Sequence, residues 1–580
     1  MSYLLNDPAD FTDEMITGFV DANSDIVRRV SGGVVRTGRT PAGQVAVVIG
    51  GGSGHYPAFG GLVGRGLAHG AAMGNVFASP SAQQVYSVAK SVATDAGVLF
   101  SYGNYAGDVL NFDQAQQRLI AEGIPCRTVV VTDDIYSAEV SEIHKRRGIA
   151  GDLAVFRAAA WAAERGGTLD EVFEFATRAN ERTRSVGVAF TGCTLPGAAA
   201  PLFTVTPGRM AVGMGIHGEP GIEEQDLPTA EALGRQLVDR LLDARPLSVD
   251  PSPTSRVAVI LNGLGSVKYE ELFVTYATVA ARLRESGMVI VQPEVGELVT
   301  SFEMAGVSLT LVWLDDELER AWLSACETSA YRRGRVIGEP DPVGIAEEVD
   351  EKSAALSPGT PESRACAQLV VDVLGAIKRV IDENVDELGR LDAIAGDGDH
   401  GIGMQRGATA ALAAARKTEQ ADAGAGATLA AAGDAWADRA GGTSGALWGL
   451  ALRAVADSIG DENAPDAATV SAGISAAADA IARVGKAELG DKTMLDALIP
   501  FAEALASRVV AGSSLTAAWR QAAEVATTAA QASADLIPRI GRARPHVEKS
   551  LGTPDPGAVS LALAATAVAV LLEDKKEVAP

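Results

Sequence analysis

The sequence predicts a two-lobed α/β region followed by an all-helical domain, and three observations lead to this prediction. At 580 residues the chain is too long for a single core. The first part of the chain alternates short apolar runs with helical stretches, which is the pattern of α/β layers. From Ser363 onward the chain is rich in alanine and helical almost to its end, with hardly a strand signal.

Short apolar runs in the first region are typical of buried strands. They are Val45–Ile49, Val98–Ser101, Thr128–Thr132, Val257–Asn262 and Ser308–Trp313. Helical stretches such as Ser81–Thr94 and Glu270–Glu285 lie between several of them. The alternation predicts largely parallel sheets, and the turn Arg245–Pro253 is the expected joint between the two lobes.

A polar, proline-bearing segment separates the two regions and predicts a linker. The expected domains are therefore residues 1–332 and 363–580, with the linker at 333–362. The helices expected in the second domain are Ala365–Leu388, Gly403–Glu419, Thr428–Ala440, Thr469–Val484 and Leu515–Ala534. The apolar stretch Ala558–Leu572 is short and alanine-rich, so we expect a buried terminal helix and not a membrane span.

The charge balance limits the partners. With 74 acidic against 49 basic residues, the net charge of −25 repels nucleic acid and anionic lipid, so neither is an expected partner. The four cysteines form no CxxC pair, and the first residues show no signal peptide. We expect a reduced, cytoplasmic protein.

Three glycine-rich motifs in the first region carry candidate site residues. His55 follows the run Gly50–Gly54, where backbone N–H groups are open to a ligand and the histidine can move protons. Asp108 follows a predicted strand in the motif NYAGD, and His217 lies in GIHGEPG with little screening by neighbouring side chains. The residues alone leave open a plain turn, a helix N-cap for Asp108 and a turn or metal-binding role for His217.

Closely spaced aspartates are the main feature of the second domain. Asp392, Asp397 and Asp399 repel one another unless a cation lies among them, and oxygen ligands favour Mg²⁺ or Ca²⁺. A solvated turn or N-caps are the alternative. Later glycine turns, at Gly441–Gly445 and Gly485–Met494, are candidate phosphate cradles or ordinary helix–helix turns. Together they indicate a nucleotide site without a Walker motif.

In order along the chain, these motifs resemble those of the fused, ATP-dependent dihydroxyacetone kinase family. GGGSGH, FASPS, NYAGD and GIHGEPG resemble the sugar-binding domain, whereas LDAIAGDGDHG, GGTSGALWG, GDKTM and DPGA resemble the nucleotide-binding domain. The resemblance covers nearly the whole chain. It implies an α/β two-lobed sugar-binding domain, an all-α antiparallel helical barrel of eight helices and a homodimer.

The resemblance implies specific roles in the sugar-binding domain. The histidine of GIHGEPG, His217, adds to the carbonyl of a ketose and holds it as a hemiaminal. Asp108 and His55 match the acid/base positions. Gly52, Ser53 and Gly54 match the turn that holds the substrate, and His55 and Asp108 belong to the substrate-binding set as well.

ATP and Mg²⁺ are the implied cofactors of the second domain. Asp392, Asp397 and Asp399 match the aspartates that hold Mg²⁺. The residues that fall where the family contacts ATP are His400, Gly401, Ile402, Gly403, Thr443, Ser444, Gly485, Met494, Arg542, Asp555, Pro556 and Gly557.

The sugar-side motifs depart from the usual family pattern at three positions. Tyr56 stands where a glutamate is common, Phe59 where a histidine is usual and Gly103 where a lysine is common. These variants resemble the erythrulose kinase branch, so the expected reaction converts D-erythrulose to D-erythrulose 4-phosphate. The alternatives are a dihydroxyacetone kinase and a non-catalytic ketose sensor on the same fold. A phosphotransferase-system component with fixed ADP is less compatible with the fused chain, and FAD cyclisation at the same nucleotide site stays open.

Overall fold

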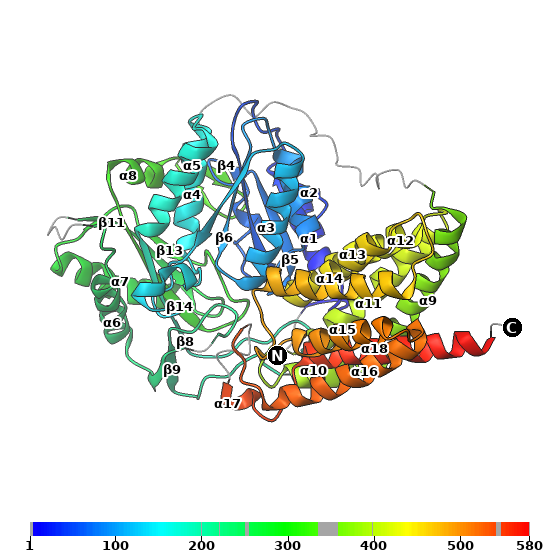
Figure 1. Cartoon of the computed structure of the whole chain (residues 1–580). Helices are drawn as coiled ribbons and strands as arrows, with labels where there is room; N and C mark the ends of the chain where they lie inside the picture. Colours follow the sequence, from blue (N-terminus) through cyan, green and yellow to red (C-terminus); the bar gives the residue numbers. More distant parts are fainter. Residues whose placement is uncertain are drawn as a thin grey trace. The chain divides into compact units, whose positions relative to one another are not determined.

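The computed structural model describes residues 4–198, 200–219, 221–249, 255–334, 358–396, 398–540 and 547–578 (Figure 1). The chain forms two compact units, Met1–Asp350 and Glu351–Pro580. All described strands belong to the first unit, and the described part of the second is helical, which confirms the predicted order of the fold classes. Most of the predicted linker lies outside the described residues, so the domain boundaries 332/333 and 362/363 stay predictions.

The first sheet has six strands in the order β1–β2–β5–β3–β6–β7. Strands β5, β3, β6 and β7 run parallel, and β1 and β2 pair antiparallel beside β5. Helices α2 and α3 cover one face, where Val85 and Phe112 pack with Val48 and Phe100 of the sheet. The bounds are β1 Val27–Val30, β2 Gly33–Arg36, β3 Ala46–Ser53, β5 Gly70–Val76, β6 Val98–Gly103, β7 Cys126–Val131, α2 Ala82–Val92 and α3 Ala106–Ala121.

The second sheet has the order β10–β9–β8–β14–β11–β12, with β13 also paired to β11. Its central strand β14 pairs antiparallel with both β8 and β11, so the prediction of largely parallel sheets is wrong here. Strands covered on both faces have the same continuous apolar run in either direction, and the run therefore did not reveal the direction. The bounds are β8 Thr183–Ala189, β9 Arg209–Val212, β10 Glu223–Asp226, β11 Arg256–Gly263, β12 Val289–Ile290, β13 Glu294–Gly296 and β14 Gly306–Trp313.

The predicted joint at Arg245–Pro253 is also wrong. Strands β8 to β10 precede this turn yet belong to the second sheet, and helix α6 (Ala230–Asp243) packs with α7 (Tyr269–Glu285) on that sheet's outer face. The chain therefore passes from the first sheet to the second at an earlier point, after α5 (Leu169–Glu181).

One helix lies between the two sheets and joins their cores. Helix α4 (Gly151–Glu164) contacts β3 and β6 of the first sheet and β8 and β14 of the second. Nearly all of its residues are buried, and its alanines allow close approach on both sides. The remaining described elements of this unit are α1 Phe11–Ala22, α8 Asp316–Leu323 and a small sheet of β4 Gly64–Arg65, β15 Cys326–Thr328 and β16 Arg332–Arg333.

Eight helices of the second unit close into a ring. Each long helix from α11 to α16 packs on the next, α16 packs on α18, and α18 and α11 both pack on α9. This agrees with the predicted helical barrel. The bounds are α9 Pro361–Glu383, α10 Val385–Asp392, α11 His400–Glu419, α12 Ala425–Ala440, α13 Gly442–Ile459, α14 Ala467–Gly485, α15 Leu495–Val510, α16 Leu515–Ala532, α17 Val547–Ser550 and α18 Pro556–Val578.

Helix α18 contains the stretch predicted as a terminal helix. It packs against α9, α15 and α16, and residues such as Ala558, Ala565 and Val568 on it are buried. Its part Pro556–Lys575 is long and apolar enough to cross a membrane, which is weak evidence because core helices of soluble proteins pass the same criterion.

Candidate functional site

The predicted glycine turn lies at the carboxyl end of β3. Strand β3 ends at Ser53, whose Oγ donates a hydrogen bond to the Gly74 carbonyl over 2.6 Å. Gly54 has a φ of 97°, and a Cβ there would come 2.9 Å from the Phe77 ring, so only glycine fits. The turn places His55 at the edge where open α/β sheets bind ligands.

His55 is buried and held in one orientation. Its Nδ1 lies 2.7 Å from the Thr300 carbonyl oxygen, and its ring stacks on Phe77 with centroids 4.9 Å apart. Because a carbonyl oxygen only accepts, Nδ1 carries the hydrogen and Nε2 has the lone pair in the neutral ring. Burial, with His217 close by, lowers the pKa of His55 to about 3. His55 is therefore neutral near pH 7.

His217 lies directly opposite His55. The two Nε2 atoms are 2.9 Å apart, and the edge of the Tyr105 ring packs on the His217 ring with centroids 4.5 Å apart. The other ring nitrogen, Nδ1, lies 3.1 Å from Glu219 Oε1. Glu219 Oε2 also accepts a hydrogen bond from the His217 backbone N–H. The glutamate of the GIHGEPG motif therefore orients the histidine of the same motif.

A buried ion-pair network supports Glu219. Arg147 lies 3.8 Å from Glu219 and donates two hydrogen bonds to Asp134 Oδ2 at 3.1 and 2.9 Å. Burial alone would raise the pKa of Glu219, but His217 and Arg147 outweigh it and hold that pKa far below its usual range. Glu219 is thus a carboxylate at all ordinary pH values, and it accepts from His217 Nδ1–H.

This hydrogen-bond pattern determines the proton count of the histidine pair. His55 Nδ1–H donates to Thr300, and His217 Nδ1–H donates to the Glu219 carboxylate. The contact between the two Nε2 atoms then requires one proton between them. The carboxylate of Glu219, on the far side of the His217 ring, lies where it can balance the charge of that proton. A nucleophilic nitrogen and a proton donor therefore lie within one hydrogen bond of each other.

Asp108 lies at the same sheet edge, in the first turn of α3 beyond the end of β6. Its side chain is 7% exposed. It adds to the negative field that raises the pKa of Asp152 and Tyr102, for both of which burial is the larger cause. Asp108 therefore places a buried carboxyl group just beyond the carboxyl end of β6, beside other acidic residues.

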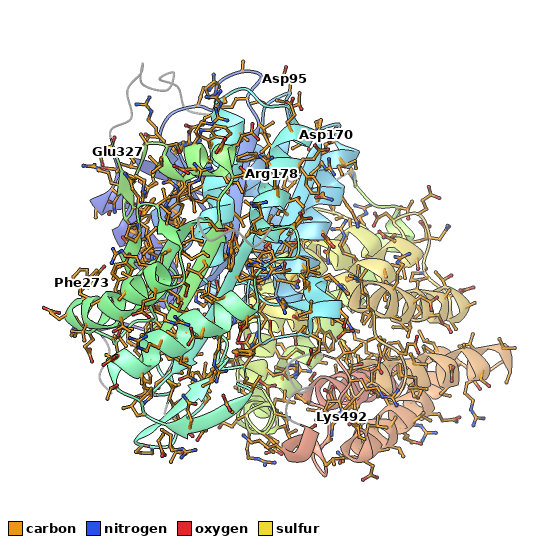
Figure 2. All side chains as sticks on the ribbon, turned by 90° about the vertical axis from the view of Figure 1, so that its left-hand side faces the viewer. Asp95, Asp170, Arg178, Phe273, Glu327 and Lys492 are labelled. Atoms are coloured by element: carbon orange, nitrogen blue, oxygen red, sulfur yellow. The ribbon has the colours of Figure 1, made fainter. Side chains whose placement is uncertain are left out.

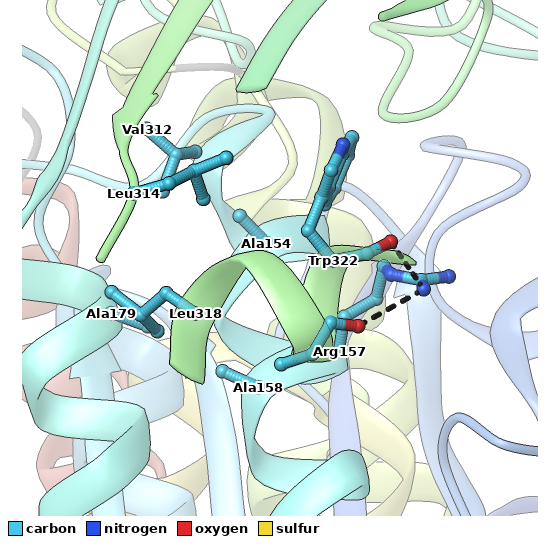
Figure 3. Close-up of a pocket in the computed structure, with 9 residues that line it drawn as sticks. Ala154, Arg157, Ala158, Ala179, Val312, Leu314, Leu318 and Trp322 are labelled. Atoms are coloured by element: carbon cyan, nitrogen blue, oxygen red, sulfur yellow. Dashed lines mark hydrogen bonds between the residues drawn. The ribbon is translucent and has the colours of Figure 1, made fainter. Parts of the chain in front are cut away.

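A separate cavity in the same unit does not fit a sugar. It lies among α4, α8 and β14, has a volume of about 10 Å³ and is lined mostly by apolar side chains such as Leu318 and Trp322 (Figure 3). The buried guanidinium of Arg157 beside it donates to the Ala321 and Trp322 carbonyls at 3.2 and 2.8 Å. The space holds about one water molecule, so this is a packing feature of the core.

The predicted nucleotide residues of the second unit gather at one end of the helical ring. Helices α11, α13, α15 and α18 begin there, so their N-terminal N–H groups point to the end where a phosphate would bind. His400 Nε2 lies 3.0 Å from Ser560 Oγ, and a Cβ at Gly557 would lie 3.3 Å from that of Met494. Gly403 faces the Ala440 carbonyl before the turn that carries Thr443 and Ser444, and Gly485 ends α14 beside Leu447.

Carboxyl groups gather at the same end; Asp496 is buried, Asp392 and Asp555 are half-buried, and Asp399 keeps an exposed part. The protein atoms packed around Asp399, together with the charge of Asp392, raise its pKa to about 7. Burial, with Asp496 and Asp392, raises the pKa of Asp555 to about 7. Oxygen donors that repel one another fit a hard cation such as Mg²⁺. Within the described residues no group of three such ligands is already arranged around one point, and Asp397 lies outside those residues.

The sequence prediction missed several residues of both sites. Arg147, Asp134, Glu219 and Tyr105 were not assigned roles, although Glu219 and Tyr105 stand inside the quoted motifs. Asp496 was also missed. In the structure its carboxylate accepts hydrogen bonds from the Gly490 and Thr493 N–H groups at 2.6 and 2.7 Å. Arg542 lies outside the described residues.

Comparison with known proteins agrees with both halves of this architecture. The Dak1 domain matches residues 17–330, and the DAK2 domain matches residues 394–570. An L-erythrulose kinase from Pectobacterium atrosepticum is 56% identical, covering 99% of this chain and 97% of that protein. A D-erythrulose kinase from Mycolicibacterium smegmatis is 53% identical, covering 98% of each.

A solved structure shares the fold over nearly the whole chain. The dihydroxyacetone kinase of C. freundii matches with a TM-score of 0.52 and 29% identity, covering 98% of this chain and 99% of that one. The same protein has been solved in complex with AMP-PNP and Mg²⁺.

Proposed function

Because the chain belongs to the family of proteins in which a Dak1 domain and a DAK2 domain are fused, we propose that it is an ATP-dependent kinase that phosphorylates erythrulose. Full-length relatives that are 52% to 56% identical are named as erythrulose kinases. The observation that carries the proposal is the contact between His55 and His217, with Glu219 behind it. This arrangement fits a substrate with a carbonyl group, to which a histidine nitrogen can add. A simple polyol has no such group.

Capture of the ketose follows from the proton count of the pair. His217 Nε2 forms a bond to the carbonyl carbon, and the electron pair of the C=O double bond moves to oxygen. The proton held between the rings passes to that oxygen by way of His55 Nε2, which lies 2.9 Å from His217 Nε2. The product is a hemiaminal with the positive charge on the His217 ring, still balanced by Glu219.

Asp108 serves the transfer step. The ketose hydroxyl attacks the γ-phosphorus of ATP, its proton passes to the Asp108 carboxylate, and ADP leaves. A desolvated carboxylate is a stronger base than one in water. Gly52, Ser53 and Gly54 form the turn that holds the captured ketose, since their backbone can approach it closely.

The ring end of the helical unit would hold ATP. His400 to Gly403, Thr443, Ser444, Gly485, Met494 and Asp555 to Gly557 supply its contacts, together with Arg542. Asp392, Asp397 and Asp399 would hold Mg²⁺, which neutralises charge on the phosphoryl oxygens when it is bound. Asp496, which is buried, and Asp555, which is half-buried, add two carboxyl groups to this set. We also propose a cytoplasmic homodimer, as the family resemblance implies.

The identity of the sugar rests on the departures from the common motif. Phe59 is 7% exposed and belongs to the core, so this position is an apolar wall and offers no polar contact to the sugar. Gly103 ends β6 without the charged side chain that a lysine would bring, and the Tyr105 ring lies 3.2 Å from where its Cβ would be. Both features favour a four-carbon ketose, with D-erythrulose phosphorylated at O4 as our first choice and dihydroxyacetone as the alternative.

An assay of Mg·ATP-dependent phosphorylation tests this proposal. D-erythrulose, L-erythrulose, dihydroxyacetone and glycerol are compared for the purified protein and for His217→Ala. We expect the highest kcat/KM for an erythrulose enantiomer, no turnover of glycerol and no activity in the variant. A higher kcat/KM for dihydroxyacetone makes the three-carbon ketose the substrate. Binding of ketoses without turnover of any would replace the kinase with a sensor.

A further inference from the structure

Asp152 is a buried carboxyl group that the mechanism above does not use. It lies in the first turn of α4, 2% exposed, and its Oδ1 has no hydrogen-bond partner among the described residues. A carboxyl oxygen removed from water without a donor destabilises the fold. Such a group calls for a donor that arrives with a ligand.

The neighbours of Asp152 offer acceptors in place of donors. Asp108 and Asp133 are close enough to raise its pKa, although burial is the larger cause. The carboxylate of Asp133 is already used, since it accepts from the Ile149 and Gly151 N–H groups at 2.9 Å each. The Gly148 carbonyl nearby accepts from the Tyr105 hydroxyl. These described neighbours therefore leave Asp152 Oδ1 without a donor.

Two glycines lie beside this oxygen, so neither of these positions adds a side chain next to it. A Cβ at Gly148 would lie 2.9 Å from Asp152 Oδ1 and 2.6 Å from the Gly103 Cα. Gly103 is the last residue of β6, and a Cβ there would lie 3.2 Å from the Tyr105 ring. The backbone therefore passes this corner closely with no side chain of its own.

The corner adjoins the histidine pair. Tyr105 packs edge-on against the His217 ring and bonds to Gly148, so one side chain spans from the nucleophile to the corner of Asp152. Asp108, the proposed base, lies at the same edge and within electrostatic range of Asp152.

We infer that Asp152 is a substrate-binding residue, which hydrogen-bonds the hydroxyl of the extra hydroxymethylene group that distinguishes a four-carbon ketose from a three-carbon one. The inference rests on the proposed function, because it names the contact that selects the sugar. A ketose hydroxyl both donates and accepts, so it satisfies Asp152 whether the carboxyl group is ionised or holds its proton. The raised pKa of Asp152 favours the protonated form in the empty site.

An ordinary helix-terminal role does not explain this residue. Aspartates in a first helical turn stabilise the helix through its dipole, but they normally do so in water. Asp170 in the first turn of α5 is such a case, with a side chain that is 77% exposed (Figure 2). Asp152 has the same helical position but is buried. The stabilisation from the helix dipole is therefore offset by the loss of hydration of its carboxyl group.

The test compares Asp152→Asn and Asp152→Ala with the matched control Asp170→Asn. Dissociation constants of erythrulose and dihydroxyacetone are measured by calorimetry without ATP, and kcat/KM is measured with Mg·ATP. We expect Asp152→Ala to weaken the binding of erythrulose by about tenfold or more. The binding of dihydroxyacetone should change by less than about threefold. Asp152→Asn keeps the volume and should give a smaller change in the same direction.

Equal losses for both ketoses, or no loss for either, would overturn the inference. Calorimetry separates it from the proposed function. If the wild-type protein binds ketoses but transfers no phosphate, the kinase proposal fails and the binding ratio still decides on Asp152. If it binds neither ketose, both fail. A variant with a lowered unfolding temperature but an unchanged ratio would show a structural role only, and would also overturn the inference.

Discussion

The Nε2 atoms of His55 and His217 lie 2.9 Å apart, each ring held from behind by an acceptor that determines its tautomer. The Thr300 carbonyl holds His55 and the Glu219 carboxylate holds His217. Because both Nδ1 atoms donate, the rings share one proton and the pair acts as a unit. The first two predictions concern this unit.

Replacing His217 and replacing His55 should affect ketose capture in different ways. His217→Ala should abolish the hemiaminal, whereas His55→Asn keeps an N–H donor near the Thr300 carbonyl and removes Nε2 with the rest of the ring. We expect the second change to lower kcat/KM by about 10²- to 10⁴-fold, the usual contribution of a positioned acid or base. ¹³C NMR of a ketose labelled at its carbonyl reports the adduct. His144→Ala, at an exposed position, is the control. An adduct in His217→Ala would contradict the assignment.

Neutralising Glu219 should lower activity without removing the nucleophile. Glu219→Gln keeps an acceptor for His217 Nδ1–H but removes the charge that balances the shared proton. We expect kcat/KM to fall by about 10- to 100-fold, as for other residues that orient a functional histidine. Steady-state kinetics with Glu223→Gln, a change in a surface ion pair a few residues away, provides the comparison. Equal effects of the two changes would argue against a role for the charge.

Buried neutral histidines should make the α/β unit sensitive to acid. The pKa of His69 is lowered well below 6.5 by burial and by Arg36, and its Nδ1 accepts from the Val47 N–H at 3.1 Å. A histidine pKa that is lower in the folded state contributes stability in full above about pH 6.5, and the contribution is lost as the pH falls below that value. The pKa of His55, about 3, has the same direction.

His69→Asn should reduce this acid sensitivity, because the asparagine oxygen also accepts from Val47 but does not titrate. The slope of unfolding free energy against pH should decrease by up to about 1.4 kcal/mol per pH unit between pH 6.5 and 5. Urea unfolding at pH 7.5, 6 and 5 measures it. Parallel curves for wild type and variant would contradict the prediction.

Asp392→Asn should weaken nucleotide binding and leave ketose binding intact. The change removes a predicted Mg²⁺ ligand and also relieves the repulsion that raises the pKa of Asp399. We expect the affinity for Mg·AMP-PNP to fall more than about tenfold, while the metal-free protein keeps its unfolding temperature or gains a little. Asp386→Asn, an exposed change on the same helix α10, is the control. Unchanged affinity in Asp392→Asn would remove this residue from the metal site.

Lys492 should be a structural residue of the helical unit. Its buried Nζ donates to the carbonyls of Ser550, Leu536 and Ala534 at 2.6, 3.2 and 3.4 Å (Figure 2). Lys492→Met leaves these acceptors without their donor, and we expect a loss of about 2–4 kcal/mol in unfolding free energy. Lys486→Met, at an exposed lysine six residues earlier, should change it by less than about 0.5 kcal/mol. Thermal and urea unfolding compare the two variants. Equal stabilities would contradict a structural role of the Lys492 hydrogen bonds.

The local elements were predictable because each depends on neighbouring residues. The apolar runs Val98–Ser101 and Val257–Asn262 became β6 and β11 with shifts of one or two residues at their ends. The same local reasoning placed the start of a helix at the Gly441–Gly445 turn, where α13 begins, but gave no range for α13 and did not predict α15. It also merged α9 with α10, which are separated at Asn384.

The sequence by itself determined the motifs, the order of the two fold classes and the identity of His55, Asp108, His217 and the aspartates as candidates. Only the tertiary structure decided that the Nε2 atoms of His55 and His217 meet, that Arg147 lies beside Glu219 and that Asp152 Oδ1 is buried without a donor among the described residues. These properties depend on burial and on contacts between residues far apart in the chain. A motif specifies which groups are present, whereas desolvation and charge neighbours set their protonation, and those arise only when the sheets and α4 pack together.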